Sequence, residues 1–78
     1  MILKVISAQE ILFQGDVRQV TLPGSQGAFT VLHGHASLIS TLTPGIITYV
    51  DSDGQQQRLD VEGGVADVDN DTVSVCIY

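Results

Sequence analysis

The chain has 78 residues, of which 15% are charged, and its formal net charge is −6. This length predicts one small domain spanning residues 1–78 and excludes a large enzyme that builds its own deep cleft. The cations are Lys4, Arg18 and Arg58. Because each contact to a phosphate backbone needs a Lys or Arg, three scattered cations argue against nucleic-acid binding and against electrostatic docking on anionic lipid.

Two further features of the composition bear on where the protein works. The single cysteine, Cys76, excludes an internal disulfide and fits a reducing cytosol. Residues 1–7 lack the basic and apolar regions of a signal peptide, and no apolar run approaches the roughly 20 residues that span a bilayer. We therefore expect a cytosolic chain without direct insertion into a bilayer.

Turn residues punctuate the chain at short intervals, as at Gly15-Asp16, Pro23-Gly24, Pro44-Gly45 and Gly63-Gly64. Between them lie short runs rich in Val, Ile, Thr and Phe, a pattern typical of an all-β sandwich or barrel. No window favours a helix, because β-branched residues, Gly and Pro are too frequent. We expect a small two-sheet β-sandwich of about nine or ten short strands. The predicted strands cover residues 2–7, 11–14, 17–22, 27–32, 37–42, 46–50, 55–62, 64–68 and 72–77.

Alternation of apolar and polar residues indicates which side chains face the core. Leu59 and Val61 alternate with charged residues, and residues 73, 75 and 77 are aliphatic with Ser74 and Cys76 between them. Each pattern is that of a half-buried strand. The turns at 51–54 and 69–71 are expected to close hairpins.

The stretch from Gln19 through Val50 contains no Asp, Glu, Lys or Arg, although charges recur every few residues elsewhere. Depletion of charge with retained polar and apolar groups is typical of the core of a protein interface. The acidic residues collect at 51–71, mostly in turns, and should be solvated. The uncharged stretch is therefore a candidate binding surface, although a small sandwich can also use Ser and Thr on its outer faces.

Two other functions are considered from the residues. His33 and His35 could share one face of a strand and bind a metal with Cys76 as a third ligand. Gly34 favours a loop instead, with histidines that bond the backbone or face a partner, and Cys76 fits a small buried hydrophobe. A carbohydrate- or peptide-binding module would need an aromatic platform, and the chain has only four aromatic residues, Phe13, Phe29, Tyr49 and Tyr78.

Residues 22–32 read LPGSQGAFTVL, and residues 35–39 read HASLI. With Pro44-Gly45, Gly63-Gly64 and the closing strand of alternating Val, this ordered set resembles the N-terminal β-sandwich domain of the epsilon subunit of F-type ATP synthase. The resemblance covers the whole chain. It implies a ten-stranded sandwich in the central stalk that binds gamma, docks on the c-ring and turns with the rotor, with no active site, cofactor or metal. It also implies a peripheral position at the cytoplasmic face of the bacterial inner membrane.

The resemblance further implies two groups of contact residues. Those facing the c-ring are Gly24, Ser25, Gln26, Gly27, Ala28, Phe29, His33 and His35. Those facing gamma are Ser7, Ala8, Ala36, Leu38, Ser40 and Leu42.

The chain departs from the family pattern in three ways. Ala28 stands where relatives often have Glu, so no salt bridge to the ring is expected from this position, and Ser37 stands where they often have Pro. The sequence ends at Tyr78, where many relatives continue into a pair of helices that restrains ATP hydrolysis and sometimes holds ATP. We therefore expect a short form that binds no ATP.

Overall fold

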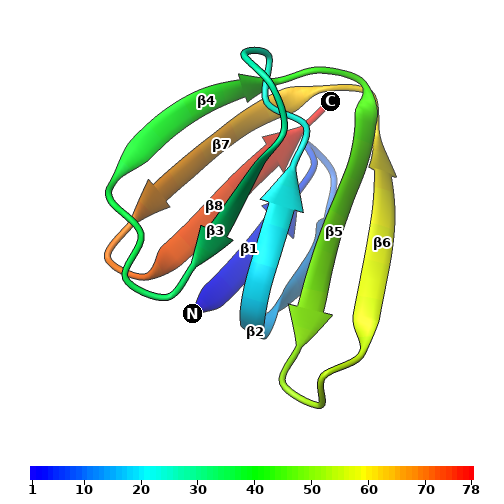
Figure 1. The fold of residues 1–78 in the computed structure, drawn as a ribbon. Coiled ribbons are helices and arrows are strands. Elements are labelled where there is room, and N and C mark those ends of the chain that lie inside the picture. Colours follow the sequence, from blue (N-terminus) through cyan, green and yellow to red (C-terminus); the bar gives the residue numbers. More distant parts are fainter.

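The fold is known from a computed structural model that describes residues 1–78, and it consists of strands and turns without a helix (Figure 1). The all-β expectation is therefore confirmed, with eight strands rather than nine or ten. The strands are β1 (Ile2–Ile6), β2 (Ile11–Leu22), β3 (Phe29–Leu32), β4 (Leu38–Leu42), β5 (Gly45–Asp51), β6 (Gln56–Val61), β7 (Gly64–Asp69) and β8 (Thr72–Ile77).

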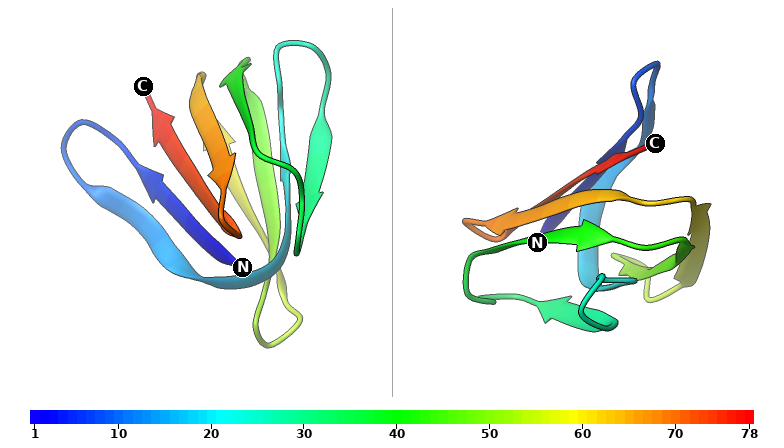
Figure 2. Two further views of the ribbon diagram at one scale, coloured as in Figure 1. Left: turned by 90° about the vertical axis from the view of Figure 1, so that its left-hand side faces the viewer. Right: turned by 90° about the horizontal axis from the view of Figure 1, so that it is seen from above.

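The strands form two sheets that share β2 (Figure 2). The first sheet has the order β4-β7-β8-β1 and ends on residues 11–16 of β2. In the second sheet, residues 17–22 of β2 lie between β3 and β5, and β6 follows β5. All pairs are antiparallel except β1 with β8, which are parallel.

The predicted break at Gly15-Asp16 is wrong, because β2 runs through it as one strand of 12 residues. The register between β2 and β5 shifts between Val17 and Gln19, which leaves Arg18 as an extra residue in β2. Such a bulge bends a strand sharply without ending it. Arg18 is held at the bend because its guanidinium donates a 2.9 Å hydrogen bond to the Ser52 carbonyl. One bent strand therefore replaces the two expected short ones.

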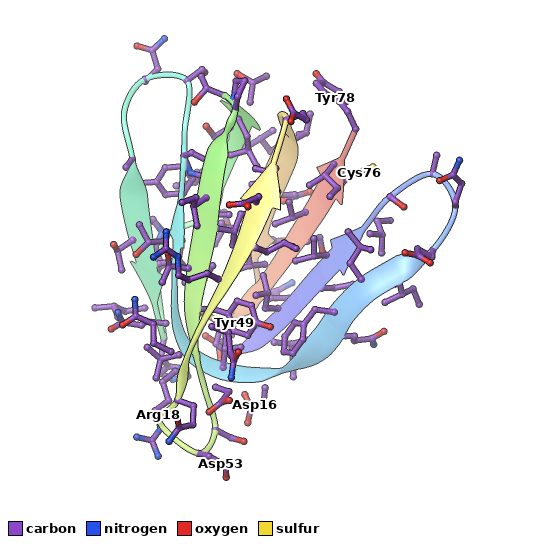
Figure 3. All side chains as sticks on the ribbon, turned by 90° about the vertical axis from the view of Figure 1, so that its right-hand side faces the viewer. Asp16, Arg18, Tyr49, Asp53, Cys76 and Tyr78 are labelled. Carbon is purple, nitrogen blue, oxygen red and sulfur yellow. The ribbon has the colours of Figure 1, made fainter.

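A single cluster of 13 buried side chains fills the space between the sheets. The first sheet contributes Leu3, Val5, Val73 and Val75, and the centre of the second contributes Ile47. The alternation predicted for β6 and β8 is confirmed, since Val61, Val73 and Val75 are buried while their polar neighbours are exposed. The rings of Phe13 and Tyr49 pack with centroids 4.5 Å apart, and Figure 3 shows the position of Tyr49.

The two predicted hairpin turns are confirmed. Gly54 has a φ of 83° in the β5–β6 turn, a conformation that glycine adopts without steric cost. In the β7–β8 turn, Asn70 and Asp71 have φ values of 50° and 58°. Two consecutive residues with positive φ match the twist of a two-residue hairpin, and Asn and Asp tolerate that region best after glycine.

The turns gather at two ends of the molecule (Figure 1). The end that we call the loop end holds the β1–β2 turn, the loop at residues 23–28, the links that leave β4 and β6, and the C-terminus. The opposite end, which we call the acidic end, holds the N-terminus, the bend of β2 and the turns that follow β3, β5 and β7. Asp16, Asp51, Asp53, Asp69 and Asp71 lie at or next to these turns.

Candidate interaction surfaces

The loop at residues 23–28, which joins β2 to β3, projects at the loop end and carries no charge. Its base is fixed to β4, because the Ser25 amide donates to the Thr41 carbonyl at 2.9 Å and the two hydroxyls lie 2.6 Å apart. The Gly27 amide donates to the Gly24 carbonyl at 2.9 Å and closes the loop on itself. Four consecutive residues, 25–28, are exposed. The loop therefore presents a fixed, neutral surface to solvent.

Gly24 is required at the base of this loop because there is no space for a side chain. A Cβ atom at this position would lie 2.7 Å from the Gly27 carbonyl oxygen and 2.8 Å from the Phe29 ring. The Phe29 ring is half-buried and packs against the core cluster. The Phe29 ring thus contacts both the backbone of Gly24 and the core, which fixes the position of the loop relative to the core.

The turn that contains His33 and His35 lies at the acidic end and is held by aspartates of the β7–β8 hairpin. His33 Nδ1 donates to Asp71 Oδ2 at 2.8 Å, and the Gly34 amide donates to Asp71 Oδ1 at 3.3 Å. Partial burial raises the pKa of Asp71, but these hydrogen bonds and the nearby His33 outweigh it and hold the pKa below its ordinary value. His35 Nδ1 donates to the Ala36 carbonyl at 2.7 Å. The expected loop is found here, and His35 bonds the backbone as expected, whereas His33 bonds the side chain of Asp71.

The structure does not bring the predicted ring-facing residues together. The exposed loop residues 25–28 lie at one end of β3, and His33 and His35 lie beyond its other end. Four strand residues at about 3.3 Å each separate the two groups by roughly 13 Å. A single flat surface at the loop end would therefore not include the two histidines, and their contact with the ring stays a prediction.

The predicted gamma-facing residues also divide by position. Ser7 and Ala8 lie in the β1–β2 turn at the loop end, where the Ser7 hydroxyl accepts 3.3 Å hydrogen bonds from the amides of Gln9 and Glu10. Ala36 is exposed near the acidic end. Leu42 is only 6% exposed and belongs to the core, so its side chain offers little surface to a partner.

Strand β4 turns the three predicted gamma-facing residues Leu38, Ser40 and Leu42 toward the interior. Leu38 and Ser40 share the inward face with Leu42 and are half-buried, whereas Ile39 and Thr41 are exposed. Ile39 is 74% exposed, the largest fraction among the Val, Leu and Ile residues of the chain. Both faces of this strand carry an apolar residue, so the sequence alone did not fix which face is buried.

The outer face of the first sheet is hollowed between β7, β8 and β1. A cavity of about 350 Å³ is lined by Lys4, Ile6, Val65, Asp67, Ser74, Val75 and Cys76. Cys76 is exposed here, which corrects the expectation of a buried thiol. The cause is the alternation of β8, because Val75 and Ile77 face inward and Cys76 between them faces outward.

The three residues of the alternative metal site do not meet. His33 bonds to Asp71 just before β8, whereas Cys76 lies near the far end of that strand. Five residues of strand correspond to about 16 Å, far beyond a shared coordination sphere. No group of three or more His, Cys, Asp or Glu side chains in the chain is arranged to hold a metal ion. The metal-site hypothesis is therefore not supported.

The chain also has no helix with the length and apolar character needed to cross a lipid bilayer.

Eight strands in two sheets that share one bent strand place the chain in the class of small β-sandwich domains. The family model described as "ATP synthase, Delta/Epsilon chain, beta-sandwich domain" matches residues 1–77. The chain belongs to this family, which confirms the resemblance seen in its sequence.

Curated relatives agree with this assignment. The chain is 47% identical to the "ATP synthase epsilon chain" of Campylobacter lari. The match covers 94% of this chain and 56% of that protein. It is 40% identical to the protein of the same name from Campylobacter jejuni subsp. doylei, and this match covers 94% of this chain and 57% of that protein. The chain spans a little over half the length of these relatives.

Two solved structures have the same fold. A chain in the structure of the Euglena gracilis mitochondrial ATP synthase, titled "OSCP/F1/c-ring in rotational state 1", matches with a TM-score of 0.92 and 26% identity. The match covers 99% of this chain and 49% of that one. A chain in the Tetrahymena thermophila mitochondrial ATP synthase structure titled "central stalk/cring" matches with a TM-score of 0.83 and 11% identity. The match covers 100% of this chain and 63% of that one, and at this identity it supports the fold alone.

Proposed function

We propose that this chain is a non-catalytic rotor subunit of an F-type ATP synthase. It binds the gamma subunit, docks on the c-ring, and couples ion-driven rotation of the ring to ATP synthesis, without a cofactor of its own. Its place is the cytoplasmic face of the bacterial inner membrane, as a peripheral member of the complex. The observation that carries the proposal is the family match over residues 1–77, together with the close structural similarity to a chain of an ATP synthase whose structure includes F1 and the c-ring.

The loop at residues 23–28 is the surface that we assign to the ring. It projects from one end of the sandwich, is fixed by Ser25 and Thr41, and lies within the uncharged stretch of the sequence. A fixed loop loses little conformational entropy on binding, which favours a stable contact. Because residues 25–28 offer only polar and small groups, we expect packing and hydrogen bonds rather than ion pairs at this contact.

The outer face of the first sheet is the surface that we assign to gamma. It extends between Ser7 and Ala8 at the loop end and Ala36 at the acidic end, and it contains the hollow lined in part by Ile6 and Val65. Exposed apolar groups beside a concave region are typical of protein-binding surfaces. The two assigned surfaces lie on different parts of the molecule, so both partners can be bound at once.

Size-exclusion chromatography with the gamma subunit from the same complex tests the proposal. We expect one co-eluting peak at micromolar concentration, and retention of detergent-solubilised c-ring when all three are mixed. The variant Asp53→Asn should co-elute with gamma in the same way as the parent chain. Asp53 is exposed in the β5–β6 turn at the acidic end, away from both assigned surfaces. Separate elution of this chain and gamma contradicts the proposal.

A further inference from the structure

Strand β4 forms an edge of the first sheet. It pairs with β7 along its length, from Leu38 with Val68 to Leu42 with Gly64. Its other side is covered only near its C-terminal end, where the Ser25 amide donates to the Thr41 carbonyl and the Thr43 amide donates to the Pro23 carbonyl. The N-terminal half of this outer edge has no neighbouring strand (Figure 1).

The backbone of Ile39 points to the open side. In an antiparallel strand the N–H and C=O groups of one residue point to the same side, and successive residues alternate. Thr41 uses its outer side to bond Ser25, so Ile39, two residues earlier, also points outward. The non-ladder backbone bonds of the molecule include none from the Ile39 amide or carbonyl. Both groups are therefore left to solvent.

This edge lacks the features that normally prevent strand addition. Natural edge strands carry charges, proline or a bulge, or are covered by other elements. Residues 38–42 contain no charge and no proline, and their register with β7 is unbroken. The Ile39 side chain, 74% exposed, lies beside this open backbone. Together, the free hydrogen-bonding groups and the exposed apolar side chain fit an added strand.

We propose that β4 accepts an extended segment of the gamma subunit as an additional strand at Ile39, an inference that rests on the proposed function. Asp67 lies directly opposite Ile39 in β7, and Asp69 follows on the same face. The added segment accordingly carries an apolar residue beside Ile39 and a Lys or Arg that reaches toward Asp67. A second copy of this chain fits less well, because it would bring another net charge of −6 and has no cation on β4.

Amide hydrogen exchange of the isotope-labelled chain, alone and with gamma, tests the inference. The Ile39 amide exchanges rapidly in the free chain and at least about tenfold more slowly in the complex, because it becomes hydrogen-bonded to the added strand. The Val75 amide, in the central strand β8, is the internal control and is protected in both states.

Each other outcome has a distinct meaning. A complex that forms while the Ile39 amide still exchanges rapidly overturns this inference and leaves the proposed function standing. Failure to form a complex overturns both. Protection of Ile39 in the free chain, with a dimer in sedimentation analysis, overturns it in favour of a second copy.

A pair of substitutions gives an independent measurement. Ile39→Pro removes the outward N–H, and because proline is tolerated where the N–H of an edge strand faces solvent, the fold is expected to persist. Its affinity for gamma falls by about tenfold or more, whereas Ile39→Val, which keeps the N–H and a β-branched side chain, binds within about twofold of the parent chain. Equal affinities of the proline and valine variants, with equal melting temperatures, overturn the inference.

Discussion

Asp51 shows how one side chain organises a turn. Its Oδ1 accepts hydrogen bonds from the amides of Asp53 at 3.0 Å and Gln55 at 2.9 Å, across the β5–β6 turn. The bond from Gln55 is the largest influence on the carboxyl group, and together with the bonds from Gln57 and Asp53 it lowers the pKa below the ordinary 3.8. The ionised form is thus favoured in the folded chain.

A pH dependence of stability follows from this lowered pKa. A carboxyl whose pKa is depressed by folding contributes stability above its unfolded pKa and loses it as the pH falls through the folded pKa. The melting temperature is therefore expected to fall below about pH 4, with Asp71 contributing in the same direction. Asp51→Asn should lower the melting temperature at pH 7 and flatten the acid decline. An acid decline as steep in the variant as in the parent chain would show that Asp51 has no part in it.

At the scale of elements, the loop at residues 23–28 depends on the absence of a side chain at Gly24. Gly24→Ala would push a methyl group against the Gly27 carbonyl and the Phe29 ring. Overpacking of this kind typically costs about 1–3 kcal/mol. We expect a lower melting temperature, loss of the ordered Ser25–Thr41 contact in the NMR spectrum, and weaker retention on the c-ring.

The control for this loop variant is Ala28→Ser, which changes an exposed loop residue without entering the packed base. It should keep the parent melting temperature and the Thr41 signals. If Gly24→Ala kept the parent stability and Thr41 signals as well, the packing of Phe29 on Gly24 would not determine the loop.

The elements that the sequence predicted correctly are those with strong local signals. Strands β6 and β8 alternate strictly, and the turns closed by Gly54 and by Asn70 carry residues suited to positive φ. Gly15-Asp16 carries the same kind of signal, yet β2 passes through it, because pairing with β1 continues on both residues. Tertiary pairing outweighed turn propensity at that point.

The candidate surfaces were predictable only in part. The loop at residues 23–28 followed from the motif and the uncharged stretch, and it is exposed as expected. The separation of His33 from this loop depends on the length of β3, and the exposure of Ile39 rather than Leu42 depends on the register of β4 with β7. Neither the length of β3 nor the register of β4 with β7 can be predicted from the composition or from the alternation of residues within one strand.

At the scale of the whole molecule, one core supports both sheets. Ile47 is fully buried at the centre of the second sheet and belongs to the same cluster as Leu3 and Val75 of the first. Ile47→Ala is expected to lower the free energy of unfolding by about 2–5 kcal/mol, because it removes buried methyl groups and leaves a cavity. A small domain of marginal stability loses much of its margin in this way.

Urea unfolding measures this effect, with the neighbouring Ile46→Ala as the matched control. Ile46 is 37% exposed on the opposite face of β5, so its truncation should cost about 1 kcal/mol or less. A single transition recorded by far-UV circular dichroism and by tyrosine fluorescence is expected for both. Equal losses in the two variants would contradict the assignment of Ile47 to the shared core.

The bent strand β2 has a mechanical consequence. Its first half belongs to the sheet assigned to gamma, and its second half leads directly into the loop assigned to the ring. In the proposed arrangement, a torque applied at one contact would be carried to the other along the continuous backbone of β2, which Arg18 anchors at the bend.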